Sequence, residues 1–211
     1  MLTFHQTPFS YSCHTMKRFF DLVIAILALI VLMPLLLIVA LLILVTDGSP
    51  VLFRQKRVGL NGRYFHLHKF RTMSRSKEAE KGSFDAGDVS RVTPLGRLLR
   101  RSKIDELPQL INVIIGHMSI VGPRPEIGKW VDMYPVRWSY VHTVRPGITD
   151  PASIIYRNEE RILAEAEDPE AVYRDEVLPH KLSLYEAYVE NQSLLQDLKI
   201  LYRTLIVVLF K

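Results

Sequence analysis

The apolar positions of the chain fall into one long block near its start and several shorter periodic stretches after it. The block runs from Leu22 to Val45 without a charged residue, and charged residues flank it on both sides. A straight helix of this length would measure about 36 Å, enough to cross a bilayer core of about 30 Å. The pattern therefore predicts a membrane helix near the N-terminus.

Pro34 lies at the midpoint of this apolar block. Proline removes a backbone donor and clashes with the preceding turn, so we expect a kink there. Each arm would be only about 18 Å long, too short to span a bilayer alone. Positive charges at 17–18 and 54–57 flank the block on both sides, which gives the positive-inside rule no preferred direction. A re-entrant helix-hairpin with both ends in the cytoplasm and a kinked single span both fit these features.

Shorter patterns follow the membrane segment. Residues 51–73 are typical of a β-hairpin that turns at Asn61-Gly62. Residues 74–91 are rich in Ser, Gly, Asp, Lys and Glu and predict a mobile loop. Leucines and arginines alternate over 95–101, as in a short amphipathic helix. Its basic face could lie on an anionic membrane or be solvated, and the pattern fits both.

The rest of the chain is predicted to be helical. Residues 102–115 indicate a helix with Ser102 as its N-cap and Asp105 in a capping box. The acidic segment 157–178 favours a solvated helix, and 194–208 carry apolar residues at helical spacing. Core packing and an interfacial position both suit that last stretch. The expected fold is α+β and mainly helical, with a membrane helix-hairpin, a small β-hairpin and amphipathic interfacial helices around a catalytic body.

Composition and charge narrow the class of protein. The chain is 48% hydrophobic, which excludes a disordered chain, and its single cysteine excludes an internal disulfide. One apolar block is too few for a multi-spanning transporter. The net charge of +5 hides a net +9 over 54–101 and a net −6 over 150–179. A basic stretch beside a membrane segment points to anionic headgroups or a phosphorylated substrate, and no nucleic-acid-binding motif accompanies it.

Asp105 and Glu106 are the residues best suited to chemistry. A carboxylate can ligate Mg²⁺, and it can attack phosphorus to form an acyl phosphate. The structural alternative is that Asp105 only complements a helix dipole, worth about 0.3–1 kcal/mol. Arg124 and Arg145 stand beside prolines, so they lose little entropy on binding a phosphate, whose oxygens match the guanidinium fork.

Other reactive residue types form weaker patterns. His66 and His68 would share one face of a strand, but no cluster of Cys, Asp or Glu lies near them in sequence. Cys13 has no recognisable catalytic context. A hydrolase elbow and a glycine loop for phosphate are both absent from the sequence.

Five longer motifs stand in a fixed order: Lys17-Arg18-Phe19-Phe20-Asp21, Gly48-Ser49-Pro50-Val51, Lys69-Phe70-Arg71-Thr72-Met73, Asp105-Glu106-Leu107-Pro108-Gln109-Leu110 with Asn112-Val113, and Met118-Ser119-Ile120-Val121-Gly122-Pro123-Arg124-Pro125-Glu126. Together they strongly resemble the bacterial sugar transferase family, the monotopic phosphoglycosyl transferases. The resemblance covers about residues 16–149.

This resemblance implies transfer of a sugar 1-phosphate from a UDP-sugar to undecaprenyl phosphate, with release of UMP. It implies Mg²⁺, a covalent phosphosugar-aspartyl intermediate, and a role at the start of lipid-linked O-antigen or exopolysaccharide assembly. Asp105 matches the family's nucleophile and metal ligand, and Glu106 matches its dyad partner. The side chains expected to bind substrate phosphates are Arg100, Arg124, Arg145, Lys69 and Arg71.

The resemblance also implies a membrane topology. Family members have a re-entrant helix broken at a Ser-Pro pair, which here is Met33-Pro34. We expect a tail at 1–16, the membrane element at 17–47 and a cytoplasmic catalytic domain at 48–211, on the inner membrane of a bacterium. Because the motifs begin near residue 17, the chain looks like a minimal catalytic form. Membrane lipids are expected partners, and a homodimer is allowed.

Two positions depart from the family pattern. His117 stands where many members have an acidic residue, and Asp150 follows Pro146-Gly147-Ile148-Thr149 where many have glycine. The second departure bears on the region that reads the donor sugar. The alternative function is a non-enzymatic membrane-anchored protein whose basic face binds anionic lipid or a partner.

Overall fold

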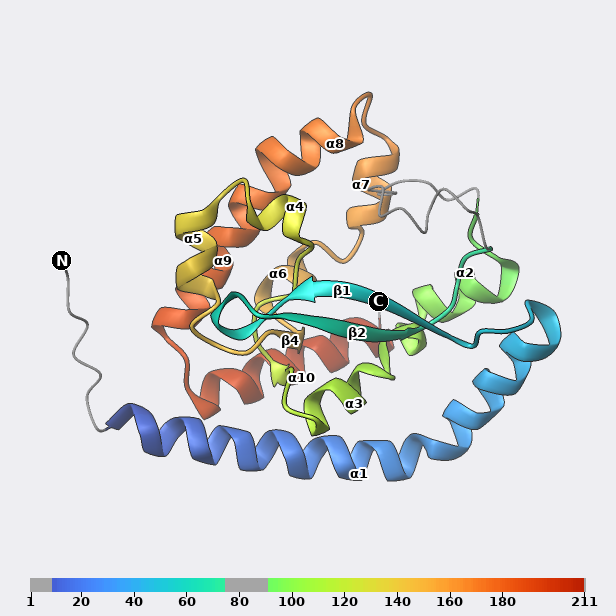
Figure 1. Cartoon of the computed structure of the whole chain (residues 1–211), viewed down its shortest axis with the longest axis horizontal. Coiled ribbons are helices and arrows are strands. Elements are labelled where there is room, and N and C mark those ends of the chain that lie inside the picture. Colours follow the sequence, from blue (N-terminus) through green and yellow to red (C-terminus); the bar gives the residue numbers. More distant parts are fainter. Residues whose placement is uncertain (1–8, 75–90, 211) are drawn as a thin grey trace.

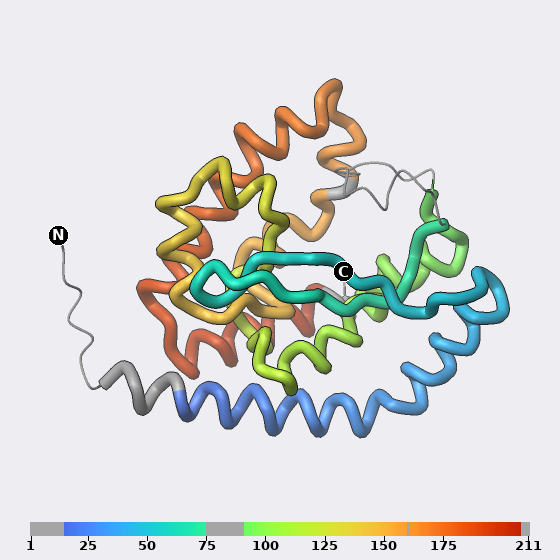
Figure 2. The backbone as a smooth tube through the Cα atoms, in the orientation of Figure 1, coloured from blue at the N-terminus to red at the C-terminus, as the bar shows by residue number. Residues whose placement is uncertain are grey.

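A computed structural model of the chain describes residues 9–74 and 91–210. Its first element is α1 (Phe9–Thr46), one continuous helix that contains Pro34. Figure 1 shows that α1 bends in its second half, and the tube in Figure 2 follows the same change of direction. The bend lies in the half of α1 that contains Pro34, where a kink was predicted, and the helix is not interrupted into two separate segments. Its Thr15–Thr46 portion is long and apolar enough to cross a membrane.

Both ends of α1 are fastened to the rest of the protein. Near its N-terminal end, the Asp21 carboxylate accepts a hydrogen bond from the backbone N–H of Ile120. At its C-terminal end, Arg71 donates to the carbonyl oxygens of Asp47 and Gly48, at 2.6 and 2.5 Å. The apolar side chains between these anchors include many that are exposed: Leu27, Ile30, Val31, Leu37, Ile38 and Leu41.

The predicted β-hairpin is confirmed. Strand β1 (Leu52–Val58) pairs antiparallel with β2 (Tyr64–Phe70), and a short 3-10 turn, η1 (Leu60–Gly62), joins them. Asn61 and Gly62 both have positive φ, at 54° and 73°, a conformation that these two residue types tolerate best. The expected loop at 74–91 lies almost wholly outside the described residues.

The next segment differs from the sequence prediction. Helix α2 (Pro94–Arg101) forms as expected, but Ser102 ends it and donates its hydroxyl to the carbonyls of Leu98 and Leu99. Lys103 then takes a left-handed conformation, with φ of 58°. A 3-10 turn, η3 (Ile104–Glu106), and α3 (Gln109–Ile114) follow. The prediction of one helix over 102–115 with Ser102 as its N-cap was wrong. Ser102 ends α2 instead, and because Lys103 is left-handed, the residues after it form a 3-10 turn and then a short helix.

Two further short strands pair parallel to each other, and Figure 1 labels one of them, β4, below the hairpin. These are β3 (Ser119–Val121) and β4 (Gly147–Thr149), and α4 (Gly128–Val131) and α5 (Pro135–Val141) lie between them in the chain. Beyond β3, Gly122 is pressed against the backbone of 145–147. A Cβ atom there would lie 2.5 Å from the Arg145 carbonyl oxygen, so only glycine permits this close approach.

The C-terminal part is helical. It comprises α6 (Pro151–Ile155), α7 (Glu159–Ala164), α8 (Pro169–Val172), a π-helical turn η4 (Tyr173–Val177), α9 (Leu178–Glu190) and α10 (Leu194–Phe210). The acidic segment 157–178 is helical, but it forms separate helices, and the prediction that it is solvated is wrong where Tyr173 and Val177 are buried. They join a core cluster around Trp130 and Trp138. Helix α10 buries Ile200 and exposes Leu195, Leu198, Tyr202 and Leu205.

Candidate active site

Asp105 and Glu106 occupy the short turn η3, and the structure buries both of them. Their residues are 6% and 8% exposed, which is unusual for two adjacent acids. The 3-10 geometry and the left-handed Lys103 before it place the pair between α2 and the start of α3. A buried carboxylate is stable only where cations or hydrogen bonds compensate it, so the neighbours of each acid decide its role.

The negative charge of Glu106 is compensated by two cations, Lys69 and Arg124. Its Oε1 accepts from Lys69 Nζ at 2.9 Å and from Arg124 Nη2 at 2.5 Å, and its Oε2 accepts from Arg124 Nη1 at 3.2 Å. Although burial alone would raise the pKa of Glu106, the charges of Arg124 and Lys69 hold that pKa well below its usual value. Glu106 is therefore an anion over the whole physiological range, and its position is fixed.

Asp105 lies in a different environment. Its Oδ1 is buried and has no hydrogen-bond partner among the described residues. Burial raises the pKa of Asp105 to about 6, and the adjacent charge of Glu106 acts in the same direction. The positive charges of Lys69, Lys103 and Arg100 oppose this rise in the pKa. Asp105 is thus a carboxylate that is mostly ionised at neutral pH and whose buried Oδ1 has no hydrogen-bond partner among the described residues.

Arg124, which binds Glu106, lies in the segment 122–126, and Glu126 anchors the far end of this segment. Glu126 accepts from Arg57 at 2.8 Å and from the Tyr173 hydroxyl at 2.7 Å. This ties the segment 122–126 to β1 on one side and to η4 on the other. Arg124, flanked by prolines, therefore reaches Glu106 from a backbone with little freedom to move.

The predicted phosphate-binding side chains divide into two groups. Lys69 and Arg124 meet at Glu106, and Arg100 acts on Asp105 through its charge. Arg71 does not join them, because it is buried and donates to the carbonyl oxygens at the end of α1. Arg145 also lies elsewhere: its Nε donates to the Gly116 carbonyl at 3.0 Å.

The two histidines of β2 do not form a metal site within the described residues. Nδ1 of His68 lies 3.1 Å from Oδ1 of Asn112, whose amide donates to the His66 carbonyl at 2.7 Å. No group of three His, Cys, Asp or Glu side chains that could hold a metal occurs in the part of the chain described. These contacts give His66, His68 and Asn112 a packing role between β2 and α3.

Mg²⁺ is commonly held by one or two carboxylates together with waters and substrate phosphates. The unpartnered Oδ1 of Asp105 offers one such ligand. The residues present therefore fit an ion that the protein shares with a phosphorylated substrate, and not one enclosed by protein groups alone.

The sequence analysis assigned no role to Lys17 and Arg18, although the structure shows clear contacts for both. Lys17 pairs with Asp197 at 2.5 Å and donates to the Val121 carbonyl at 3.0 Å. Arg18 donates to the carbonyls of Val113, Ile114 and Met118. The Lys-Arg-x-x-Asp spacing was the available signal, and its function is to bind the start of α1 to the body.

Asp150 and Gln109 are two further buried polar residues near this region. Asp150 caps α6 by accepting from the Ser153 N–H at 2.9 Å, and its charge acts on Arg124. Burial raises the pKa of Asp150. Gln109 begins α3, four residues after Asp105, and its Nε2 has no partner among the described residues. An unpaired buried donor is costly unless a bound group completes it.

The family model of the bacterial sugar transferases matches residues 12–211. The chain belongs to the bacterial sugar transferase family. This confirms the predicted family, and together with the names of the relatives it confirms the predicted enzyme class, a phosphoglycosyl transferase.

Curated relatives agree with this assignment. The transferase is 40% identical over 189 residues to the sugar transferase EpsL of Bacillus subtilis, covering 90% of this chain and 85% of that one. It is 38% identical over 194 residues to a UDP-glucose:undecaprenyl-phosphate glucose-1-phosphate transferase of Caulobacter vibrioides, covering 89% and 67%. It is 35% identical over 192 residues to a UDP-N-acetylgalactosamine-undecaprenyl-phosphate N-acetylgalactosaminephosphotransferase of Aeromonas hydrophila. That match covers 90% of this transferase but only 42% of the relative.

Proposed function

We propose that this transferase moves a sugar 1-phosphate from a UDP-sugar to undecaprenyl phosphate through a covalent intermediate on Asp105. The names of the relatives from Caulobacter and Aeromonas support both substrates. The observation that carries the proposal is the contrast between two adjacent buried acids. Glu106 is bonded to two cations, whereas Asp105 keeps an oxygen without a partner among the described residues.

In the first half-reaction, a carboxylate oxygen of Asp105 attacks the phosphorus that bears the sugar. A new bond forms between that oxygen and phosphorus, the bond from phosphorus to the bridging oxygen breaks, and UMP leaves with the bond's electron pair. The product is a mixed anhydride between Asp105 and the sugar phosphate. Arg100 and Lys103 supply positive charge beside Asp105, where the donor diphosphate would lie.

In the second half-reaction, a phosphate oxygen of undecaprenyl phosphate attacks the same phosphorus. The bond between Asp105 and phosphorus breaks, which frees the carboxylate and yields a lipid diphosphate that carries the sugar. Because the two substrates use one site in turn, ping-pong kinetics are expected. Mg²⁺ bound through Asp105 would supply charge neutralisation for the phosphates.

We infer that α1 enters and leaves the membrane on the same side. The two ends of a single span would lie about 30 Å apart, on opposite sides of the bilayer core. Here Asp21 near one end and Arg71 at the other end attach α1 to the same body. Exposed apolar side chains of α1 lie between these anchors, so the helix can dip into one leaflet while the active site stays at headgroup depth.

The intermediate can be tested by incubating the full chain with a UDP-sugar and no lipid acceptor. We expect release of one UMP per chain and a mass increase equal to one sugar phosphate, located on the peptide that contains Asp105. A panel of UDP-sugars scored by UMP release would identify the donor. UMP release without a protein adduct, under quench conditions that preserve acyl phosphates, would contradict the proposed intermediate.

The topology can be tested independently by thiol labelling in intact cells. Cys13 and a cysteine introduced at the exposed Ser139 of α5 precede and follow the apolar block of α1, so they report on its two ends. We expect a reagent confined to the periplasm to label neither residue, and both to react after lysis. Labelling of Cys13 but not of the Ser139→Cys site would establish a single span instead.

A further inference from the structure

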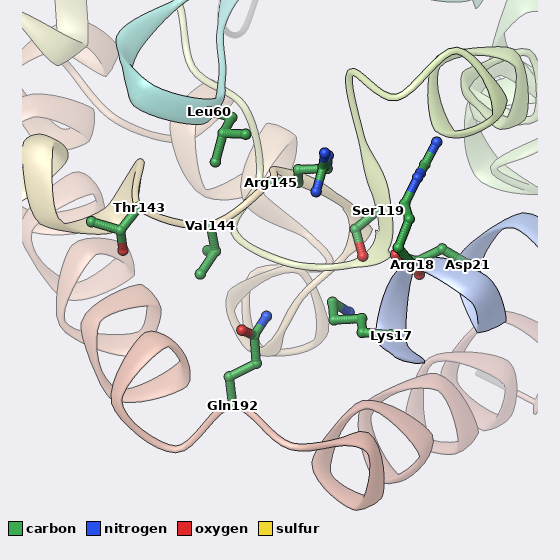
Figure 3. A pocket seen from close by; sticks show the side chains of 9 residues that line it. All are labelled: Lys17, Arg18, Asp21, Leu60, Ser119, Thr143, Val144, Arg145 and Gln192. Atoms are coloured by element: carbon green, nitrogen blue, oxygen red, sulfur yellow. The ribbon is translucent and has the colours of Figure 1, made fainter. Parts of the chain in front are cut away.

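A pocket lies where the N-terminal end of α1 meets the body, as Figure 3 shows. Its cavity has a volume of about 40 Å³, more than the ~10–15 Å³ that one water requires. It lies at the C-terminal end of α3, where Arg18 and Arg145 contact carbonyl oxygens of 113–118. The two acids of the candidate active site precede the other end of α3, so this pocket is a separate site.

The pocket has more positive than negative charge. Lys17, Arg18 and Arg145 line it, and Asp21 is the acid among its lining residues. Lys17 is paired with Asp197. The two arginines instead donate to backbone carbonyls, and the charge of Asp21 offsets part of that of Arg18. Their like charges repel each other, so an anion in the pocket would relieve a repulsion that the chain leaves in place.

Donor groups remain available for such an anion. Arg145 uses Nε for the Gly116 carbonyl, and within residues 9–74 and 91–210 no hydrogen bond engages its two terminal nitrogens. Gln192 uses Nε2 for one bond, to the Tyr188 hydroxyl at 3.2 Å, and its amide has a second proton. A planar guanidinium with two free nitrogens matches the oxygens of a phosphate group.

The position of the pocket favours a ligand at the membrane surface. Met16, Phe19 and Phe20 on the same turns of α1 are exposed, and the apolar block begins one turn later. Aromatic and basic residues at the end of a membrane helix lie typically at headgroup level. A phosphate bound here would be at the depth of lipid phosphates and would hold the start of α1 to the surface.

We propose that this pocket, centred on Arg145, binds a phosphate group supplied by an anionic lipid headgroup or by free phosphate. The proposal does not depend on the proposed function, because it concerns a different pocket. It gives Arg145 a role in attaching the protein to its membrane, in place of the expected contact with a substrate phosphate.

The test is protection of a cysteine placed in the pocket. Thr143 is exposed and lines the pocket, so Thr143→Cys in a full-length Cys13→Ser chain reports on this site alone. Its rate of reaction with the uncharged reagent N-ethylmaleimide is measured in phosphatidylcholine vesicles, with and without phosphatidylglycerol. A parallel titration uses inorganic phosphate. The control cysteine, Ser139→Cys on α5, corrects for the general effect of an anionic surface on thiols.

We expect phosphatidylglycerol to slow the reaction at position 143 but not at position 139. Arg145→Gln should weaken the apparent affinity about tenfold or more, as expected for the loss of charge-assisted hydrogen bonds. Arg145→Lys, which keeps the charge, should retain part of the protection. Arg161→Gln removes one exposed positive charge on α7 and should have no effect.

The two arms distinguish the source of the phosphate group. Protection by inorganic phosphate as well as by lipid would support a site for the phosphate group alone, and protection by phosphatidylglycerol only would support a lipid headgroup site. Absence of protection in both arms, or protection that persists unchanged in Arg145→Gln, would overturn the proposal.

Discussion

Arg124 binds both carboxylate oxygens of Glu106, with Nη2 at 2.5 Å from Oε1 and Nη1 at 3.2 Å from Oε2. Lys69 adds a second cation at Oε1. The cationic hydrogen bonds of this cluster are thus directed to Glu106, and Oδ1 of Asp105 receives none from the described residues. This division supports the proposal that the two adjacent acids differ in role, with Glu106 as a fixed anion bonded to the cations and Asp105 as the reacting group.

Replacing Arg124 by lysine tests the bidentate contact between Arg124 and Glu106. Arg124→Lys keeps the charge but cannot reach both oxygens of Glu106 with the same planar fork. We expect kcat/KM for the UDP-sugar to fall about 10–100-fold, because a misplaced cation binds transition-state charge less well. Steady-state UMP release measures this. A matched control is Lys129→Arg, an exposed cation that pairs with Glu170; an equal loss there would remove the special role of Arg124.

Arg71 is a second arginine whose role can be separated by measurement. It donates to the carbonyls of Asp47 and Gly48, so Arg71→Gln should free the C-terminal end of α1. We expect the free energy of unfolding to fall by about 1–3 kcal/mol, with faster amide exchange near residues 43–48. Thermal unfolding in detergent and hydrogen exchange measure the two effects. If the free energy of unfolding and the amide exchange were unchanged but KM rose, Arg71 would instead bind a substrate phosphate, as expected from the sequence.

His142 gives the protein a predictable response to acid. It stacks on Trp138 at 5.1 Å, and its buried Nε2 has no partner among the described residues. Burial lowers the pKa of His142 from 6.5 to about 4. Between these values the unfolded chain binds a proton that the folded chain does not, so stability falls as the pH falls through this window.

The variant His142→Phe keeps the stacking and removes the titration. Relative to the wild type, it should lose less stability between pH 6.5 and pH 4, by roughly 2 kcal/mol. Thermal unfolding at a series of pH values measures the difference. If stability fell equally with pH in the two proteins, His142 would be protonated as easily in the folded state as in the unfolded one, which would contradict the prediction.

Sequence patterns were most informative where local geometry decides the structure. Asn61-Gly62 predicted the hairpin turn, because the backbone there requires positive φ. The helix predicted from Ser102 failed for the opposite reason. Its capping pattern was consistent, but Lys103 adopts a left-handed conformation that a lysine rarely takes and that no spacing rule indicates.

The candidate site shows the same limit. The resemblance singled out Asp105 and Glu106, and five cations were expected to bind a substrate phosphate, but the turn that carries the two acids was found only in the structure. Which of the five cations reach the dyad depends on long-range packing: Arg71 is held by the end of α1, and Arg145 by the carbonyl after α3. Neither contact leaves a periodic signal, since each joins segments that are more than 20 residues apart.

The most direct test of the central claim is UMP release by Asp105→Asn. The substitution keeps the size of the side chain but removes the nucleophilic carboxylate, so we predict that UMP release from the cognate UDP-sugar is abolished and that no protein-bound sugar phosphate forms. Asp132→Asn, an exposed site on the same chain, should retain wild-type turnover. Near-normal UMP release by a folded Asp105→Asn protein would contradict the account.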